Sequence, residues 1–286
     1  MNNMDLNERF AKNWLFLFSN AFILAVGGFV TLFFVIYSRV KINPEIIGSY
    51  YQALLFLAGF ATLIITPVGI LYQSNVEKLT RFEWAIKLRP TFYGFSVLIL
   101  FMYGFYLFNK AGINIKIVEL AAAGYGIYLF YRFQDALVKD GLPAWRHPTT
   151  ATNIMAGLAK TGISALIWVF RGPEMQNLIA NMILTVLLLE ILIIYARFKF
   201  LTKRSAETYQ TARIMMMQHN FLFALRIIIG LFIPLIYVAY HFLGKIESFY
   251  FIGMFLVLGE LLERFLFVYT AVPVMPVDPA SSESLR

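Results

Sequence analysis

Six charged residues interrupt long apolar runs in the second half of this 286-residue chain. Charged side chains at membrane depth are costly, and they usually pair with one another, line a watery cavity or carry protons. At a helical rise of about 1.5 Å per residue, all six would lie roughly 6–12 Å from the same ends of their runs. The sequence therefore predicts one charged layer, which either fixes helix packing or forms a proton route beside a ligand pocket. The six are Lys160, Glu190, Arg226, Glu260, Glu263 and Arg264.

The elements that hold these charges are predicted to be membrane-spanning helices. A helix needs about 20 apolar residues to cross a bilayer, and the chain is 60% hydrophobic with only 14% charged residues. The runs are too long for barrel strands and do not alternate apolar with polar residues. We therefore expect an all-α integral membrane protein with a bundle of eight transmembrane helices. The spans are placed near 14–36, 48–72, 90–108, 116–133, 153–170, 177–196, 220–240 and 248–268.

The spans divide the chain into an N-terminal segment, 1–13, a membrane domain, 14–268, and a flexible tail, 269–286. Two four-helix halves meeting near residue 153 are possible from the helix count alone. Most Lys and Arg residues fall on the side of the two termini, which predicts that both termini are cytoplasmic and that the chain resides in the cytoplasmic (inner) membrane. This bias also accounts for the net charge of +8 without nucleic acid as a partner. The longer loops, at 73–89, 134–152 and 197–219, lie on the same side and offer a platform for a partner protein.

Redox metals are not expected in this chain. It has no cysteine, which excludes thiolate metal sites and iron–sulfur ligation. Its three histidines are His147, in a predicted loop, and His219 and His241, at opposite ends of one span. No two are expected at matching depth on facing helices, so a bis-histidine haem is not predicted.

Other polar residues could bind a quinone. Asn20 lies in the first span, and Tyr131 and Arg132 end the fourth. Their side chains can hydrogen-bond a quinone carbonyl while aromatic neighbours pack on its ring. The alternative is that Tyr131 and Arg132 are ordinary interfacial anchors.

Four stretches together resemble a known family. They are FSNAFILAVGGFV at 18–30, DGLPAW at 140–145, NFLFALR at 220–226 and GELLERFLF at 259–267. In order and spacing, the chain resembles the membrane-anchor subunit of dimethyl sulfoxide reductases, within the wider group of polysulfide-reductase-type anchors. The family's eight-helix layout fits nearly the whole length, and the most specific element is Gly-Glu-x-x-x-Arg-x-x-Phe, from Gly259 to Phe267.

The resemblance implies a non-catalytic subunit that binds a quinone, usually menaquinol. It would pass electrons between the quinone pool and a peripheral oxidoreductase made of an iron–sulfur subunit and a molybdopterin subunit. By this resemblance, Arg226, Glu260 and Arg264 match positions of the family in its last two spans. One departure is the absence of a His-Leu-Gly-x-Pro-like turn after the second span, where Tyr72 would have to act as the proton partner of the quinone.

Two alternatives to this function stay open on the residues alone. The charged layer could line the path of a small-molecule transporter or channel. The chain could also be a purely structural membrane anchor without a ligand.

Overall fold

Helices make up the fold wherever it can be described. The computed structural model describes residues 26–27, 94, 97, 100, 115–140, 143–169, 173–245 and 249–271. These ranges contain no strand, which confirms the predicted all-α class for them. Their elements are α4 (Ile115–Asp140), the 3₁₀ turn η4 (Pro143–Trp145), α5 (Pro148–Val169), α6 (Pro173–Lys203), α7 (Ala206–Arg213), the π-helix η5 (Ile214–Gln218), α8 (Asn220–Ile227), the π-helix η6 (Ile228–Phe232), α9 (Ile233–Phe242) and α10 (Tyr250–Tyr269).

Two of these helical segments are long and apolar enough to cross a membrane. They are Gln176–Lys203, with 28 residues, and Asn220–Phe242, with 23 residues, and both have a mean hydropathy of 2.5. Helix α10 has 20 residues, a spanning length, but Glu260, Glu263 and Arg264 interrupt its apolar sequence. Helix α10 is therefore long enough to cross a membrane, and it differs from the other two segments in its charged residues.

The predicted loops at 134–152 and 197–219 are largely helical, and this corrects the boundaries expected from sequence. Helix α4 continues to Asp140, and α6 continues to Lys203. The apolar runs end earlier because charged residues begin there, yet Lys and Arg are good helix formers and prolong the backbone ladder. After α6, the capping box of Ser205 and Thr208 starts α7, which passes directly into η5.

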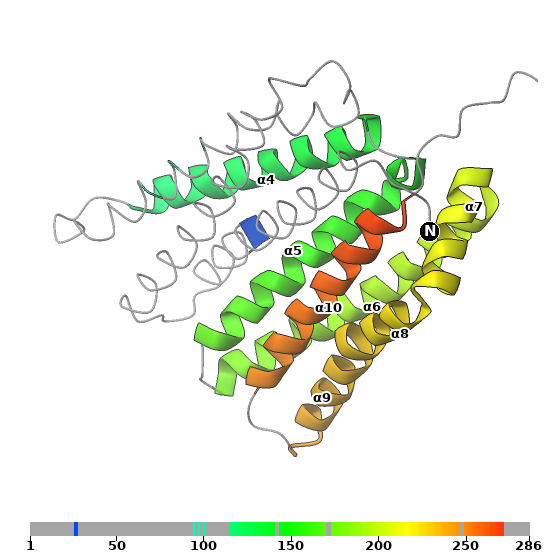
Figure 1. Ribbon diagram of the computed structural model, residues 1–286. Coiled ribbons are helices and arrows are strands. Elements are labelled where there is room, and N and C mark those ends of the chain that lie inside the picture. Colours follow the sequence, from blue (N-terminus) through cyan, green and yellow to red (C-terminus); the bar gives the residue numbers. More distant parts are fainter. Residues whose placement is uncertain are drawn as a thin grey trace, which may run out of the picture.

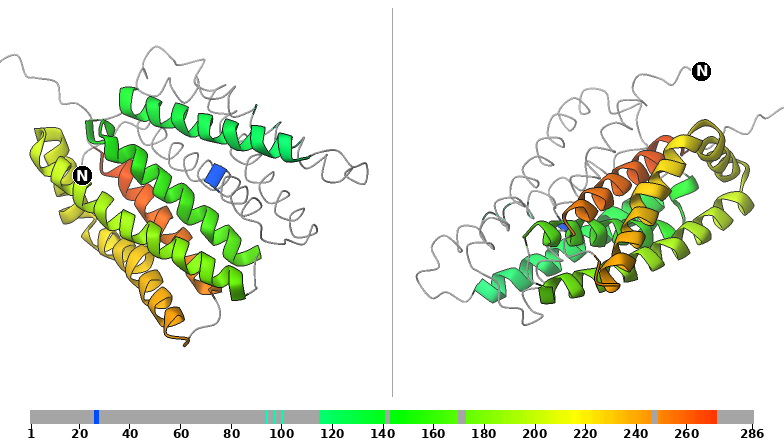
Figure 2. Two further views of the ribbon diagram at one scale, coloured as in Figure 1. Left: turned by 180° about the vertical axis from the view of Figure 1, so that it is seen from behind. Right: turned by 90° about the horizontal axis from the view of Figure 1, so that it is seen from below.

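Helix α5 occupies the centre of the described bundle. It packs against α6 on one side and α10 on another, and α10 also packs against α8 and η6. Figures 1 and 2 show these helices running side by side, with α4 on the far side of α5 from α8 and α9. Leu166, Leu187 and Leu256, from α5, α6 and α10, are at most 1% exposed. The core of the described part therefore lies between these three helices.

Two glycines allow α10 and η6 to approach closely. A Cβ placed on Gly230 would lie 2.9 Å from the Cα of Gly259, and a Cβ on Gly259 would overlap Gly230. Small residues at such crossings let helix backbones touch, which is a common basis of helix association in membranes. The π-helical turn η6 precedes Pro234, which has no N–H to donate and whose ring crowds the carbonyl four residues earlier. That carbonyl belongs to Gly230.

Trp145 connects the segment before α5 to the end of α10 by a ring contact and a hydrogen bond. Its side chain is fully buried and stacks on Phe267 with ring centroids 5.3 Å apart. Its indole Nε1 donates to the backbone carbonyl of Phe267 at 3.0 Å, and the hydroxyl of Thr150 donates to the carbonyl of Trp145 at 2.8 Å. These contacts fix the depth of α5 relative to α10, and so align the charged residues that the two helices carry.

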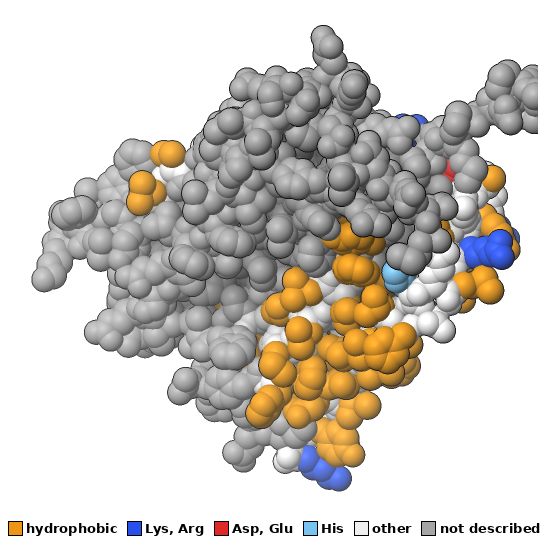
Figure 3. Space-filling view, viewed as in Figure 1, with side chains coloured by type: hydrophobic (Ala, Val, Ile, Leu, Met, Phe, Trp, Pro, Cys, Tyr) orange, Lys and Arg blue, Asp and Glu red, His pale blue; other side chains and the backbone are white. Residues whose placement is uncertain are grey.

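The outer faces of α6 and of the α8–α9 run are apolar. Large exposed side chains gather over these elements, and Figure 3 shows hydrophobic residues covering much of the described surface. Exposed apolar areas of this extent are typical of surfaces that meet lipid or another protein. Examples are Leu188, Leu192, Phe221, Ile228, Phe232 and Ile236.

Candidate functional site

A buried cluster of charged side chains lies where α5, α6, α8 and α10 meet. Every member is at most 9% exposed. The structure brings together all six charges that the sequence placed in one layer, and it adds Arg197. We call this set the charged cluster. It comprises Lys160 from α5, Glu190 and Arg197 from α6, Arg226 from α8, and Glu260, Glu263 and Arg264 from α10.

Lys160 links two carboxylates on different helices. Its Nζ lies 2.9 Å from Oε1 of Glu190 and 2.8 Å from Oε2 of Glu260. Glu190 also accepts from Nη2 of Arg226 at 2.6 Å. One side of the cluster therefore connects α5, α6, α8 and α10 through two carboxylates.

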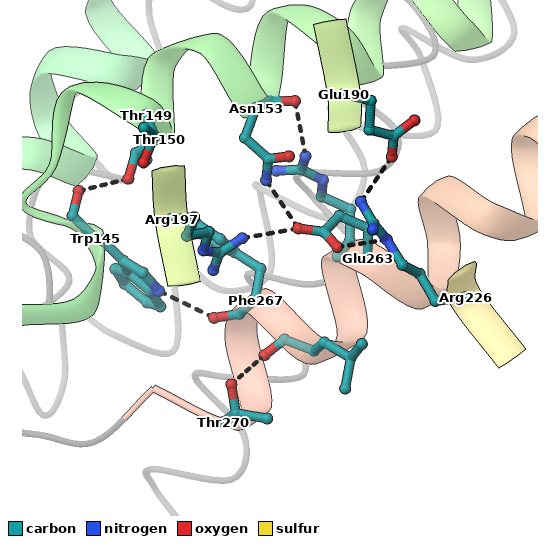
Figure 4. Close-up of polar contacts among 12 residues, drawn as sticks. Trp145, Thr149, Thr150, Asn153, Glu190, Arg197, Arg226, Glu263, Phe267 and Thr270 are labelled. Atoms are coloured by element: carbon teal, nitrogen blue, oxygen red, sulfur yellow. Dashed lines mark hydrogen bonds and ion pairs between the residues drawn. The ribbon is translucent and has the colours of Figure 1, made fainter. Parts of the chain in front are cut away.

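Glu263 organises the other side of the cluster (Figure 4). Its Oε2 lies 2.8 Å from Nε of Arg226, and its Oε1 accepts from Nη1 of Arg197 at 2.7 Å and from Nδ2 of Asn153 at 3.0 Å. Both carboxylate oxygens are thus satisfied by donors from three other helices. Arg226 reaches Glu190 and Glu263 at once, because its guanidinium presents several N–H groups in a fixed fork.

Arg264 closes the cluster within α10. Its Nε donates to Oε1 of Glu260, four residues earlier on the same helix face, at 2.7 Å. Its Nη2 donates to the backbone carbonyl of Asn153 at 3.3 Å. Gly157 makes room for this arrangement, because a Cβ there would overlap the Glu260 carboxylate.

The cluster carries one more positive than negative charge when all its groups are ionised. Lys160 and three arginines face three glutamates. The Oε2 of Glu190 has no hydrogen-bond partner among the described residues, and Oε2 of Glu260 faces Lys160 without a well-directed hydrogen bond. The cluster is therefore connected throughout but retains acceptor capacity beside its only lysine.

Removing one partner from such a cluster is expensive. Desolvation offsets much of the attraction between buried ions, so the pairs themselves are weak evidence for stability. Loss of one partner, however, leaves a buried charge uncompensated and typically costs about 3–5 kcal/mol. The cluster consequently fixes how four helices pack, whatever else it does.

An apolar cavity of about 600 Å³ lies on another side of α5 and α6. Helices α4, α5 and α6 line it together with Val26 and Gly27, and a Cβ on Gly27 would overlap the carbonyl of Leu158. The lining is almost entirely aliphatic and aromatic, with two polar side chains, both on α6. Representative lining residues are Ile127, Phe130, Met155, Ile163, Asn181 and Thr185.

The cavity and the charged cluster share the same two helices. Lys160 directly follows the cavity-lining Ala159 on α5. Glu190 follows the cavity-lining Val186 by four residues on α6, about 6 Å along the helix. The two features are therefore built in part from neighbouring residues of the same two helices.

The quinone-binding candidates chosen from sequence are not brought together at this cavity. Tyr131 and Arg132 lie near the middle of α4 with exposed side chains, Tyr131 at 58%, and neither lines the cavity. The α4 residues that do line it include Phe130, directly before Tyr131, and Ile127, about one turn earlier. Asn20 and Tyr72 lie outside the described residues.

Sequence analysis missed the polar residues at both features. The sequence predicts a loop at Arg197 because the apolar run ends there, although Arg197 lies seven residues, two helical turns, after Glu190 and so on the same face of α6. Asn153 is predicted only as the first residue of a span, and nothing in the sequence distinguishes Asn181 and Thr185 from other residues of an apolar helix.

Comparisons with known proteins add no assignment: no family model, curated protein or solved structure matches the chain. The function must therefore be argued from what the two features can do. The cavity can hold a flat apolar ring with a tail, and the cluster contains groups that can stabilise or relay charge.

Proposed function

We propose that this chain is a multi-pass membrane subunit that binds a quinone and passes electrons between the quinone pool and a peripheral oxidoreductase. In this proposal the chain forms an eight-helix bundle in the cytoplasmic membrane with both termini cytoplasmic. Its partners are an iron–sulfur subunit and a molybdopterin subunit. The iron–sulfur cluster that receives the electrons belongs to a partner subunit, because this chain contains no cysteine to ligate such a cluster.

The observation that carries the proposal is the juxtaposition, on α5 and α6, of an apolar cavity and a buried charged cluster. A volume of about 600 Å³ is within the usual range of small-ligand sites, and its lining suits a hydrophobic ring and tail. A quinone also needs polar partners for its two oxygens. The helix wall next to the cavity supplies charges that could take part in proton release.

The polar pair on α6 matches both redox states of such a ligand. The amide of Asn181 is exposed and can donate to a quinone carbonyl. The hydroxyl of Thr185 donates its hydrogen to the backbone carbonyl of Asn181 at 2.8 Å, which leaves its oxygen as an acceptor for a quinol O–H. These two residues are therefore the best candidates to hold the ring.

Oxidation of a quinol releases two electrons and two protons, so the site needs a polar exit for the protons. In the proposed mechanism the charged cluster provides it. Lys160 and Glu190 are nearest in sequence to residues that line the cavity, and Glu260 forms an ion pair with Lys160. The Oε2 of Glu190, which has no hydrogen-bond partner among the described residues, is an acceptor for this purpose. The terminal substrate of the complex is reduced or oxidised elsewhere, on the catalytic subunit.

The test uses the full chain in lipid nanodiscs with a short-tailed naphthoquinone as the probe. Thr185→Trp would fill the cavity, and Thr202→Trp is the matched control, because Thr202 is also exposed on α6 and also bonds the carbonyl four residues earlier. We expect about one naphthoquinone per wild-type or Thr202→Trp chain, and a large loss of binding in Thr185→Trp. Equal binding by all three proteins would remove this cavity as the quinone site.

Two measurements distinguish the alternatives. Solute flux through liposomes containing the chain alone would favour a transporter or channel. Absence of saturable naphthoquinone binding in an assembled complex would favour a purely structural anchor. The ion pairs of the charged cluster would then serve only to fix the packing of the helices.

A further inference from the structure

A second cavity, of about 440 Å³, lies along one side of the α7–η5 segment. The described residues that line it are Tyr209, Gln210, Arg213, Ile214, Met217 and Gln218. It is separate from the charged cluster and from the apolar cavity, and it contributes to neither the quinone site nor the proton route proposed above.

In the membrane arrangement proposed above, on which this inference rests, the cavity lies at the height of a membrane surface. The α7–η5 segment connects Gln176–Lys203 to Asn220–Phe242, the two helical stretches with the length and composition to cross a bilayer. A connection between two such helices sits just beyond the ends of both. Lipid phosphate groups occupy the same layer.

The lining is divided between polar and apolar groups. Arg213 is exposed and makes no ion pair within the part of the chain that the structure describes. Tyr209 and the two glutamines offer hydrogen-bond donors around it, whereas Ile214 and Met217 form an apolar edge. An occupant that satisfies this lining has a negative charge at one end and an apolar body at the other.

The stretch of chain that carries the cavity is basic, which favours an anion. Residues 198–219 contain the cations Lys199, Lys203, Arg204 and Arg213 and the single carboxylate Glu207. All four cations are exposed. Figure 3 shows basic side chains beside hydrophobic ones at the α7 end of the molecule. Arginine is well suited to phosphate because its fork can donate two parallel hydrogen bonds.

The apolar edge continues into the lipid-facing surface. Met216, Met217 and Phe221 are 54%, 68% and 71% exposed, and they follow the cavity toward the exposed apolar face of α8–α9. A free phosphate would leave this edge uncovered, whereas the acyl chain of a phospholipid would lie along it. Basic pockets at the membrane surface are a recurrent form of lipid headgroup site.

We propose that the α7–η5 cavity binds the headgroup of an anionic phospholipid, with its phosphate on Arg213 and an acyl chain along Met217 and Phe221. The lipid occupies the junction between two spanning helices. It thereby anchors α7 at the membrane surface, on the same side as the end of α6.

The experiment is native mass spectrometry of the full-length protein released from nanodiscs of equal phosphatidylglycerol and phosphatidylcholine. The wild-type protein should retain phosphatidylglycerol in preference to phosphatidylcholine. Arg213→Gln should reduce that preference about fivefold, the effect expected for loss of a hydrogen bond to the phosphate. Lys203→Gln is the matched control, because Lys203 is exposed on the same side but does not line the cavity. It should keep most of the preference.

Three results would overturn the proposal. They are a wild-type protein with no preference between the two lipids, an Arg213→Gln protein with an unchanged preference, and equal losses in Arg213→Gln and Lys203→Gln. A soluble competitor separates the source of the phosphate. Excess glycerol phosphate should not displace the retained lipid, and displacement by it would identify a site for a soluble anion instead. Because Arg213 is exposed, its substitution leaves the fold intact.

Discussion

Arg197 Nη1 lies 2.7 Å from Glu263 Oε1, and this ion pair joins the end of α6 to the second half of α10. Arg197 also stacks over the ring of Phe267, 4.9 Å from its centroid. Glu263 in turn holds Arg226 on α8. One carboxylate therefore connects three helices, and the stability of the bundle should depend unequally on the two arginines that contact it.

Arg226→Met should destabilise the protein more than Arg197→Met. Arg226 contacts both Glu190 and Glu263, so its removal leaves two buried carboxylates short of a cation and should cost about 3–5 kcal/mol. Arg197→Met should cost less, because Glu263 keeps Arg226 and Asn153. Thermal unfolding in detergent measures the order, with the exposed Arg204→Met as the control. An Arg197→Met protein less stable than Arg226→Met would contradict it.

Glu260→Gln tests whether the charged cluster serves quinol oxidation. The change keeps the shape of the side chain but removes its charge and its titratable proton, next to Lys160 and Arg264. Turnover with quinol should fall strongly in the assembled complex, whereas turnover with an artificial donor to the catalytic subunit should be unchanged. The control is Glu207→Gln on α7, because Glu207 lies outside the charged cluster. Full quinol activity in Glu260→Gln would rule out the proton-route role, and failure to assemble would favour a structural one.

Gly259→Ala tests the close approach of α10 and η6. A Cβ on Gly259 would overlap the backbone of Gly230, which cannot yield as a flexible side chain could, so the two helices must move apart. Overpacking of this kind costs about 1–3 kcal/mol. Gly124→Ala on α4 is the control, because a Cβ there meets nothing within 4 Å. It should leave thermal stability unchanged or raise it slightly, since alanine favours a helix.

How far the sequence predicts this molecule depends on whether a feature is local. The apolar runs indicate helices because the length of a run, about 20 consecutive apolar residues, can be read from that run alone. The charged cluster follows from the depth of each charge along its own helix, so Lys160, Arg226 and Glu260 were expected to meet. Arg197 was missed because it falls where the apolar run ends, although its spacing from Glu190 gives the same helix face.

The apolar cavity could not be predicted, for a different reason. Its shape depends on how three helices pack around Val26 and Gly27, and its largely aliphatic lining resembles other apolar helix surfaces. The π-helical turn η6 is a similar case. Pro234 indicates a disturbed helix, but the form of the disturbance depends on the contact between Gly230 and α10.

His147, just before α5, should make stability depend on pH. Burial lowers the pKa of His147 below its ordinary 6.5, and the nearby positive charges of Arg204 and Arg197 lower it further. The geometry agrees with a neutral ring, because the backbone N–H of Thr149 donates to Nδ1 at 3.1 Å and that nitrogen must remain an acceptor.

The sign of the effect follows from the direction of this shift. Above pH 6.5 the ring is neutral in both the folded and the unfolded chain, and its contribution to stability is fully present. As pH falls below 6.5 the unfolded chain takes up the proton first, so stability decreases until the lower folded pKa is reached.

His147→Gln removes this linkage between protonation and stability. Thermal midpoints at pH 7.5 and 5.5 should therefore differ less in His147→Gln than in wild type. An unchanged difference in His147→Gln would show that His147 does not control the acid sensitivity of the fold.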